Sequence, residues 1–154
     1  MTRKQQETGI YRRIVVKAGT NVLTGRTDNL DLELMASLVE QVADLHQRGI
    51  EVLLVTSGAI ASGGQVLDIG GKREDIPSRQ ALAAVGQSRL MHIYEQFFEN
   101  HNIAVAQALL SRGNIMDREG YLNVRNTLLT LLDLKVIPII NENDVVAVEE
   151  IGVE

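Results

Sequence analysis

Four short apolar runs, separated by segments with helical spacing, most constrain the fold of this chain. They lie at residues 13–17, 51–60, 103–110 and 136–144 and are rich in Val, Ile, Leu and Ala. Such runs are typical of strands buried on both faces of a parallel sheet. Aromatic residues make up only 3% of the chain, so aliphatic side chains must build the core. Because strands and helices alternate, we predict a mostly parallel sheet with helices on both faces, a three-layer α/β/α fold.

The segments between these runs carry apolar residues every three or four positions, as amphipathic helices do. For the first helix we expect Asp28 or Asn29 as the N-cap and Gly49 just past the end. The second helix is expected to begin at Ser78 and the third at Asp117. The expected buried positions are Leu34, Met35, Leu38, Val39, Val42 and Leu45 in the first helix, Leu82, Val85, Leu90, Ile93 and Phe97 in the second, and Leu128, Leu131 and Leu132 in the third.

Charge, cysteine content and hydropathy exclude several classes of function. The net charge is −5 and no basic stripe is present, so we expect no nucleic-acid-binding surface. The chain has no cysteine, which rules out thiolate catalysis and thiolate zinc sites, and His46, His92 and His101 lack the spacing of metal ligands. No apolar run reaches the ~18 residues of a membrane span, which favours a soluble, cytoplasmic protein. We expect residues 1–12 to form a flexible tail before one domain at 13–154.

Lysine and glycine follow the first expected strand where it ends. Parallel strands end at one edge of the sheet, and ligands of such folds bind in the crevice outside that edge. Lys17 closes the first strand, and Gly19 and Thr20 follow directly. A lysine beside flexible backbone N–H groups suits a phosphate group. The alternative is a snorkelling lysine before an ordinary turn.

The second and fourth strands also end in polar groups. Ser57, Gly58 and Ala59 lie at a strand-to-helix junction, where free N–H groups suit a carboxylate or a phosphate; alternatively, Ser57 only caps the helix. The fourth strand ends in NEND, with two amides and two carboxylates in a row. Turn formation explains any one of them, but the cluster favours binding of an amino-acid-like ligand by Asn141 and Asp144. We expect these groups and Lys17 to share one pocket rim.

Five motifs, KAGTNVL, VTSGAIASG, AAVGQSRLM, DREGYLNVRNTL and VIPIINENDVV, resemble the amino acid kinase family in sequence and order. The resemblance runs from about Arg13 to Glu154. It implies ATP-dependent phosphorylation of the γ-carboxylate of L-glutamate, the first step of proline biosynthesis, with Mg²⁺ as the ion. It also implies that Lys17 contacts the transferring phosphoryl group and that Gly19 and Thr20 form the adjoining phosphate loop.

The same resemblance implies which residues bind the substrate. Ser57, with Gly58 and Ala59, resembles the glutamate-binding turn of the family. Asn141 and Asp144 resemble residues that hold the α-amino end of the substrate. L-proline is the implied feedback inhibitor, at a site overlapping that of glutamate, and a homo-oligomer is the expected assembly.

The catalytic domain of the family continues well past Glu154. The resemblance therefore implies that this chain is a truncated, N-terminal, substrate-binding part, which should bind nucleotide poorly and turn over little. Within the same class, an acetylglutamate- or aspartate-type kinase is the alternative. From another class, a non-catalytic, self-associating fragment is the alternative, since truncation exposes strand edges and apolar faces.

Overall fold

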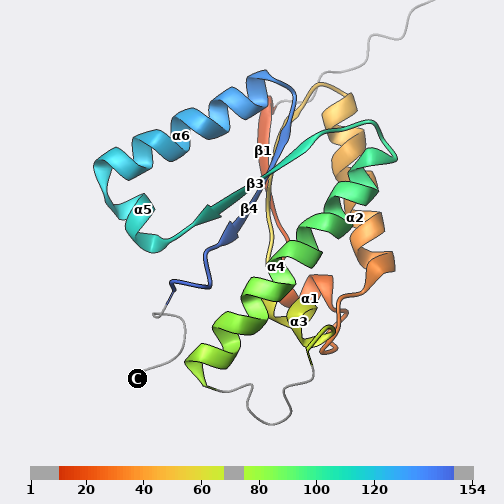
Figure 1. The fold of residues 1–154 in the computed structure, drawn as a ribbon. Helices are drawn as coiled ribbons and strands as arrows, with labels where there is room; N and C mark the ends of the chain where they lie inside the picture. The colour runs from red at the N-terminus through yellow and green to blue at the C-terminus, as the bar shows by residue number, and fades with distance from the viewer. Residues whose placement is uncertain (1–10, 68–74, 148–154) are drawn as a thin grey trace, which may run out of the picture.

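The computed structural model describes residues 11–67 and 75–147, and within them it shows a four-stranded parallel sheet (Figure 1). The sheet order is β1-β2-β4-β3, and all three pairings are parallel, as predicted. All but two residues of the predicted N-terminal tail lie outside the described residues, so its flexibility stays a prediction. The strands are β1 (Arg13–Lys17), β2 (Glu51–Val55), β3 (Val105–Leu110) and β4 (Ile137–Glu142).

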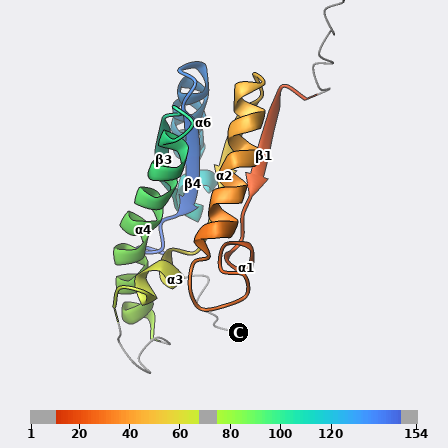
Figure 2. The same cartoon turned by 90° about the vertical axis from the view of Figure 1, so that its right-hand side faces the viewer.

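Helices lie on both faces of this sheet, which confirms the predicted α/β class. The helices α2 and α4 cover one face and α6 lies on the other (Figures 1 and 2). Spacing predicted the three long helices, whereas the short α1 and α5 were not predicted. The helices are α1 (Thr20–Leu23), α2 (Leu32–Gln47), α3 (Ala59–Gly64), α4 (Ile76–Glu99), α5 (Arg112–Met116) and α6 (Arg118–Asp133). No helix within the described ranges has the length and apolar character needed to cross a bilayer.

The predicted N-cap of α2 is wrong. Asp31 caps this helix, and its Oδ1 accepts hydrogen bonds from the backbone N–H groups of the next turn. Asp28 and Asn29 do not cap because they belong to the preceding turn, in which Asn29 donates its N–H to the Thr27 hydroxyl. The predicted end is confirmed: Gly49 follows the C-cap with φ at 87°, a left-handed conformation that glycine adopts without strain.

The predicted start of α4 is also wrong. Asp75 is the N-cap and accepts a 2.8 Å hydrogen bond from the backbone N–H of Ser78, so the helix begins before Ser78. Pro77 lies in the first turn, where its missing N–H costs no helical hydrogen bond. For α6 the prediction is confirmed, since the Asp117 carboxylate accepts from the backbone N–H of Gly120 at 2.7 Å.

The main core lies between the sheet and the α2–α4 pair. Fully buried residues include Tyr94 and Phe98 of α4, which the predicted stripe left out. The predicted Leu34 and Val85 are instead 44% and 36% exposed. Burial of every strand on both faces was also expected, and β1 contradicts it. Its residues alternate between exposed and half-buried, and Val15 is 63% exposed, so the described residues cover only one face of β1.

Candidate functional site

A cavity of about 380 Å³ opens where β1, β2 and β4 end. These strand ends form the lower edge of the sheet in Figure 1. We name it the strand-end cavity. Its walls come from α1 and the turn after it, the junction between β2 and α3, the first turns of α4, and the segment that follows β4. The lining residues are Thr20, Thr27, Asp28, Ser57, Gly58, Ile60, Ala61, Arg79, Gln80, Leu82, Asp144 and Ala147.

Four predicted site residues, Thr20, Ser57, Gly58 and Asp144, line this cavity. They follow three different strands, and parallel pairing brings them to one edge, as the sequence analysis expected. Ala59 begins α3 directly behind Gly58 and is buried. Hydroxyl, backbone and carboxylate groups from distant parts of the chain therefore face one small space.

The junction between β2 and α3 has a specific backbone conformation. Gly58 is the N-cap of α3 with φ at 92°, and an added Cβ would come within 3.1 Å of a Leu30 methyl group. The alternative role of Ser57 as the helix cap is therefore wrong. The Ser57 hydroxyl instead forms a 2.8 Å hydrogen bond with the hydroxyl of Thr20, which joins the ends of β1 and β2.

Lys17 and Asn141 lie at the same sheet edge but do not line the strand-end cavity. Lys17 is exposed and ends β1, and in a strand its side chain lies on the face opposite to that of the buried Ala18. Gly19 follows as the N-cap of α1. Of the residues expected to share one rim, the structure joins Ser57, Gly58 and Asp144 and leaves Lys17 and Asn141 outside the lining.

Asn141 belongs to a chain of side-chain amides that ties β4, α4 and β3 together. It is only 6% exposed, and its Nδ2 donates a 2.7 Å hydrogen bond to Oε1 of Gln87. Nε2 of Gln87 in turn donates to Oε1 of Gln107 at 3.1 Å. Both glutamines line a second cavity of about 710 Å³, and Asp144 lines both cavities. The amide chain therefore fixes the end of β4 beside the strand-end cavity.

A buried hydrogen bond links α4 to the end of β2, next to the junction between β2 and α3. The hydroxyls of Thr56 and Tyr94 lie 2.8 Å apart, and both residues are buried. Burial raises the pKa of Tyr94 to about 12, although the hydrogen bond with Thr56 acts in the opposite direction. The Tyr94 phenol is therefore neutral at physiological pH and links α4 to the end of β2.

Two glycines let α3 and α4 pack backbone against backbone. A methyl group on Gly86 would overlap the carbonyl oxygen of Ala59, and one on Gly63 would overlap the carbonyl oxygen of Leu82. Any larger residue at either position would push α3 away from α4. Gly86 thus fixes the junction that carries Ser57 and explains why the AAVGQ motif needs its glycine.

Sequence reasoning missed Arg79, which lines the strand-end cavity from the first turns of α4. Within the described part of the chain, its Nε atom is buried and has no hydrogen-bond partner. Asp28, predicted only as a helix cap, lines the cavity as well. No spacing pattern marks either residue, because both approach the site only through the packing of helices and turns.

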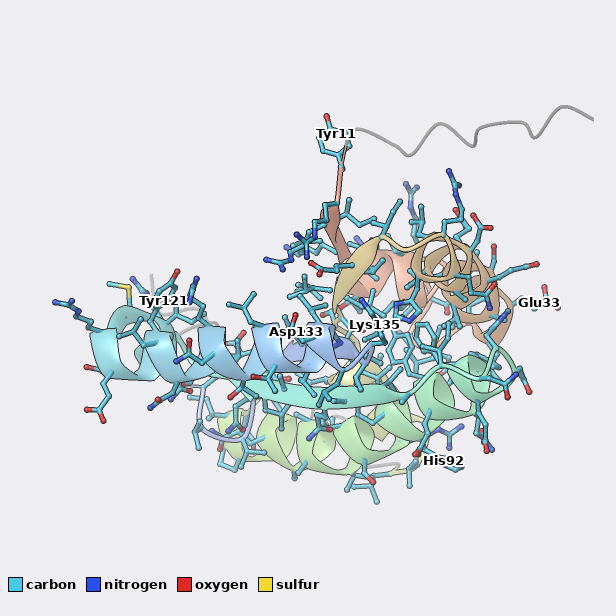
Figure 3. The ribbon with its side chains drawn as sticks, turned by 90° about the horizontal axis from the view of Figure 1, so that it is seen from above. Tyr11, Glu33, His92, Tyr121, Asp133 and Lys135 are labelled. Carbon is cyan, nitrogen blue, oxygen red and sulfur yellow. The ribbon has the colours of Figure 1, made fainter. Side chains whose placement is uncertain are left out.

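The histidines stay apart from this site. His92 is exposed on α4 and lines the second cavity, not the strand-end cavity (Figure 3). Burial, and then the positive charge of Lys135, lower the pKa of His46. Among residues 11–67 and 75–147, no group of three His, Asp or Glu side chains is arranged to hold a metal ion.

The sequence model of the amino acid kinase family matches residues 12–153. The chain belongs to the amino acid kinase family. The match confirms the resemblance drawn from the motifs and agrees with the parallel α/β sheet. Three motifs of that resemblance, KAGTNVL, VTSGAIASG and VIPIINENDVV, contain lining residues of the strand-end cavity.

Curated members of the amino acid kinase family named glutamate 5-kinase are about half identical to this chain. One from Dehalococcoides mccartyi is 55% identical over 141 residues, which are 92% of this chain and 38% of the relative. One from Herpetosiphon aurantiacus is 54% identical over 144 residues, 94% of this chain and 39% of the relative. One from Chlorobaculum tepidum is 48% identical over 142 residues, 92% of this chain and 39% of the relative. The chain thus spans less than two fifths of these relatives' length.

Proposed function

We propose that this chain binds L-glutamate in the strand-end cavity and forms the substrate-binding part of an enzyme that phosphorylates the γ-carboxylate of L-glutamate. The observation that carries the proposal is the convergence of Thr20, Ser57, Gly58 and Asp144 on one cavity of about 380 Å³. The name shared by relatives at 48–55% identity supports the choice of substrate.

Asp144 and Asn141 are proposed to hold the α-ammonium group of the substrate. The Asp144 carboxylate lines the cavity and offers the opposite charge. Nδ2 of Asn141 donates to Gln87, which fixes the amide orientation and turns Oδ1, a hydrogen-bond acceptor, to the other side. The amide chain thus sets the direction from which an ammonium group can approach Asn141.

Lys17, Gly19 and Thr20 are proposed to hold the phosphate end. The exposed Lys17 ammonium offers a positive charge at the sheet edge, and the Thr20 hydroxyl lies within the cavity beside Ser57. ATP, when bound, would supply the phosphoryl group, and the accompanying Mg²⁺ would neutralise part of the negative charge of that group. The γ-carboxylate of glutamate is ionised near neutral pH, so the site needs no general base. Positioning and charge neutralisation by these residues then provide the catalysis.

The same proposal covers the wider role of the protein. We place the reaction at the first step of proline biosynthesis, in the cytoplasm, in an enzyme that assembles as a homo-oligomer. L-proline carries the same α-carboxylate and α-ammonium groups as L-glutamate, so we propose it as a feedback inhibitor at an overlapping site.

Calorimetric titration with L-glutamate tests the proposal. The chain should bind L-glutamate, and Asp144→Asn should weaken binding by roughly 10-fold or more, because a charge-assisted hydrogen bond is lost. Asp133→Asn, an equal charge change at an exposed position near the end of α6 (Figure 3), is the control and should bind as the wild type does. Equal binding by Asp144→Asn and the wild type would contradict the proposed role of Asp144.

A ligand panel and an activity assay separate the alternatives. N-acetyl-L-glutamate, which has no ammonium group, and L-aspartate should bind more weakly than L-glutamate. Tighter binding of either would favour the acetylglutamate- or aspartate-type alternative. A coupled assay should find little formation of γ-glutamyl phosphate by this chain alone, and robust turnover would contradict its assignment as a substrate-binding part.

A further inference from the structure

Arg79 is the one arginine or lysine among the described residues that line the strand-end cavity. It lies in the first turns of α4, where its backbone N–H donates to the Asp75 carbonyl oxygen. Its side chain is half-buried, and the Nε atom is fully enclosed. Nothing in the proposed function so far uses this positive charge.

The environment of Arg79 differs from that of the arginines that form ion pairs. Arg12 and Arg13 form ion pairs with Glu51, and Arg48 pairs with Asp44. In the described ranges Nε of Arg79 is buried and has no acceptor. A buried N–H group without a partner is costly, and native proteins rarely keep one. Because the enclosed Nε cannot be reached from the cavity, a ligand there would bind the terminal guanidinium N–H groups, which form no ion pair within the described residues.

We propose that Arg79 binds the α-carboxylate of L-glutamate. This inference rests on the proposed function and adds the group that recognises the substrate as an α-amino acid. A guanidinium presents its N–H donors in a planar fork that matches the two oxygens of a carboxylate. Asp144, the proposed partner of the α-ammonium, lines the same cavity, and both groups of the ligand are attached to one carbon.

The γ-carboxylate is the poorer match for Arg79. It must reach the phosphate end of the site, which we assigned to Lys17 and Thr20, and its oxygen must donate electrons to phosphorus. A guanidinium bound to both of its oxygens would withdraw that electron density. Arg79 therefore fixes the end of the substrate that does not react.

Two substitutions at Arg79 and a matched control test the proposal. Arg79→Met keeps the length of the side chain and removes the charge, whereas Arg79→Lys keeps the charge and removes the fork. Arg89→Met makes the same charge change on the exposed side of the same helix, outside the cavity. Each variant is titrated calorimetrically with L-glutamate, with L-glutamine, which retains only the α-carboxylate, and with L-isoglutamine, which retains only the γ-carboxylate.

Arg79→Met should lower the affinity for L-glutamate and L-glutamine by about 10- to 100-fold, the effect of losing hydrogen bonds to a charged group. The affinity of Arg79→Met for L-isoglutamine should equal that of the wild type. The affinity of Arg79→Lys for L-glutamate should lie between those of Arg79→Met and the wild type, and Arg89→Met should bind all three ligands as the wild type does. If Arg79→Met binds L-glutamate as the wild type does, the inference is wrong. If Arg79→Met instead lowers the affinity for L-isoglutamine and leaves the affinity for L-glutamine unchanged, Arg79 binds the γ-carboxylate and the proposal is overturned.

Thermal unfolding without ligand separates binding from folding. Arg79→Met removes a buried donor that lacks a partner, so its melting temperature should equal or exceed that of the wild type. A marked loss of stability would show that Arg79 supports the fold, and would contradict the proposal. Failure of the wild-type chain to bind L-glutamate would instead contradict the proposed function itself.

Discussion

Gly86→Ala tests whether the backbone contact between α3 and α4 fixes the site. The added Cβ would overlap the Ala59 carbonyl oxygen and the Gly63 backbone nitrogen, and these atoms cannot rotate away as a side chain does. Overpacking costs about 1–3 kcal/mol, and we expect the upper part of this range because whole helices must separate. The greater helix propensity of alanine offsets about 1 kcal/mol of that cost. The net loss is then about 2 kcal/mol of unfolding free energy.

Thermal unfolding followed by circular dichroism measures this loss. For a chain of this size, about 2 kcal/mol lowers the melting temperature by roughly 4–8 °C. Gly113→Ala in α5 is the control, since its Cβ would meet only the Ser111 hydroxyl at 3.8 Å. It should be neutral or slightly stabilising. Because Gly86→Ala displaces the Ser57–Gly58 junction, it should also weaken L-glutamate binding. A Gly86→Ala protein as stable as the wild type would refute the reasoning.

Two further predictions concern residues outside the lining of the strand-end cavity. Gln87→Met leaves the buried Nδ2 of Asn141 without its acceptor, so the unfolding free energy should fall by about 1–3 kcal/mol in urea titrations, while Gln87→Glu, which still accepts, should lose less. The hydrogen bond from Arg13 is the main cause that lowers the pKa of Glu51. The ionised carboxylate therefore stabilises the folded protein above its unfolded pKa of about 4.3, and this stabilisation is lost as the pH falls through the lower, folded-state pKa. Unfolding from pH 7 to pH 3 should therefore show a weaker acid destabilisation for Glu51→Gln than for the wild type, and an unchanged pH dependence would contradict this.

The parallel sheet could be predicted because its signal is local. The run from Glu51 to Val55 is apolar throughout after its first residue, and segments with helical spacing separate it from the neighbouring strands. The exposure of Val15 could not be predicted, since the burial of a strand face depends on what covers it. The N-cap predictions for α2 and α4 failed for a related reason: several acidic or polar residues precede each of these helices, and the preceding turn decides which one caps.

The site shows the same division between local and long-range signals. Thr20, Ser57, Gly58 and Asp144 follow strands directly, so parallel topology alone brings them to one edge. Arg79 lies on a helix whose position depends on the close crossing of α3 and α4. That crossing requires glycines at two places distant in sequence, and no periodicity reveals that they meet.

Mapping of L-glutamate binding by nuclear magnetic resonance tests the central claim most directly. Backbone amide shifts of the ¹⁵N-labelled chain should move at the Ser57–Gly58 junction, in α1 and around Asp144. Amides at the opposite end of the sheet, near Arg13 and Glu51, should stay in place. Shifts confined to that opposite end, or no shifts at all, would contradict a glutamate site where β1, β2 and β4 end.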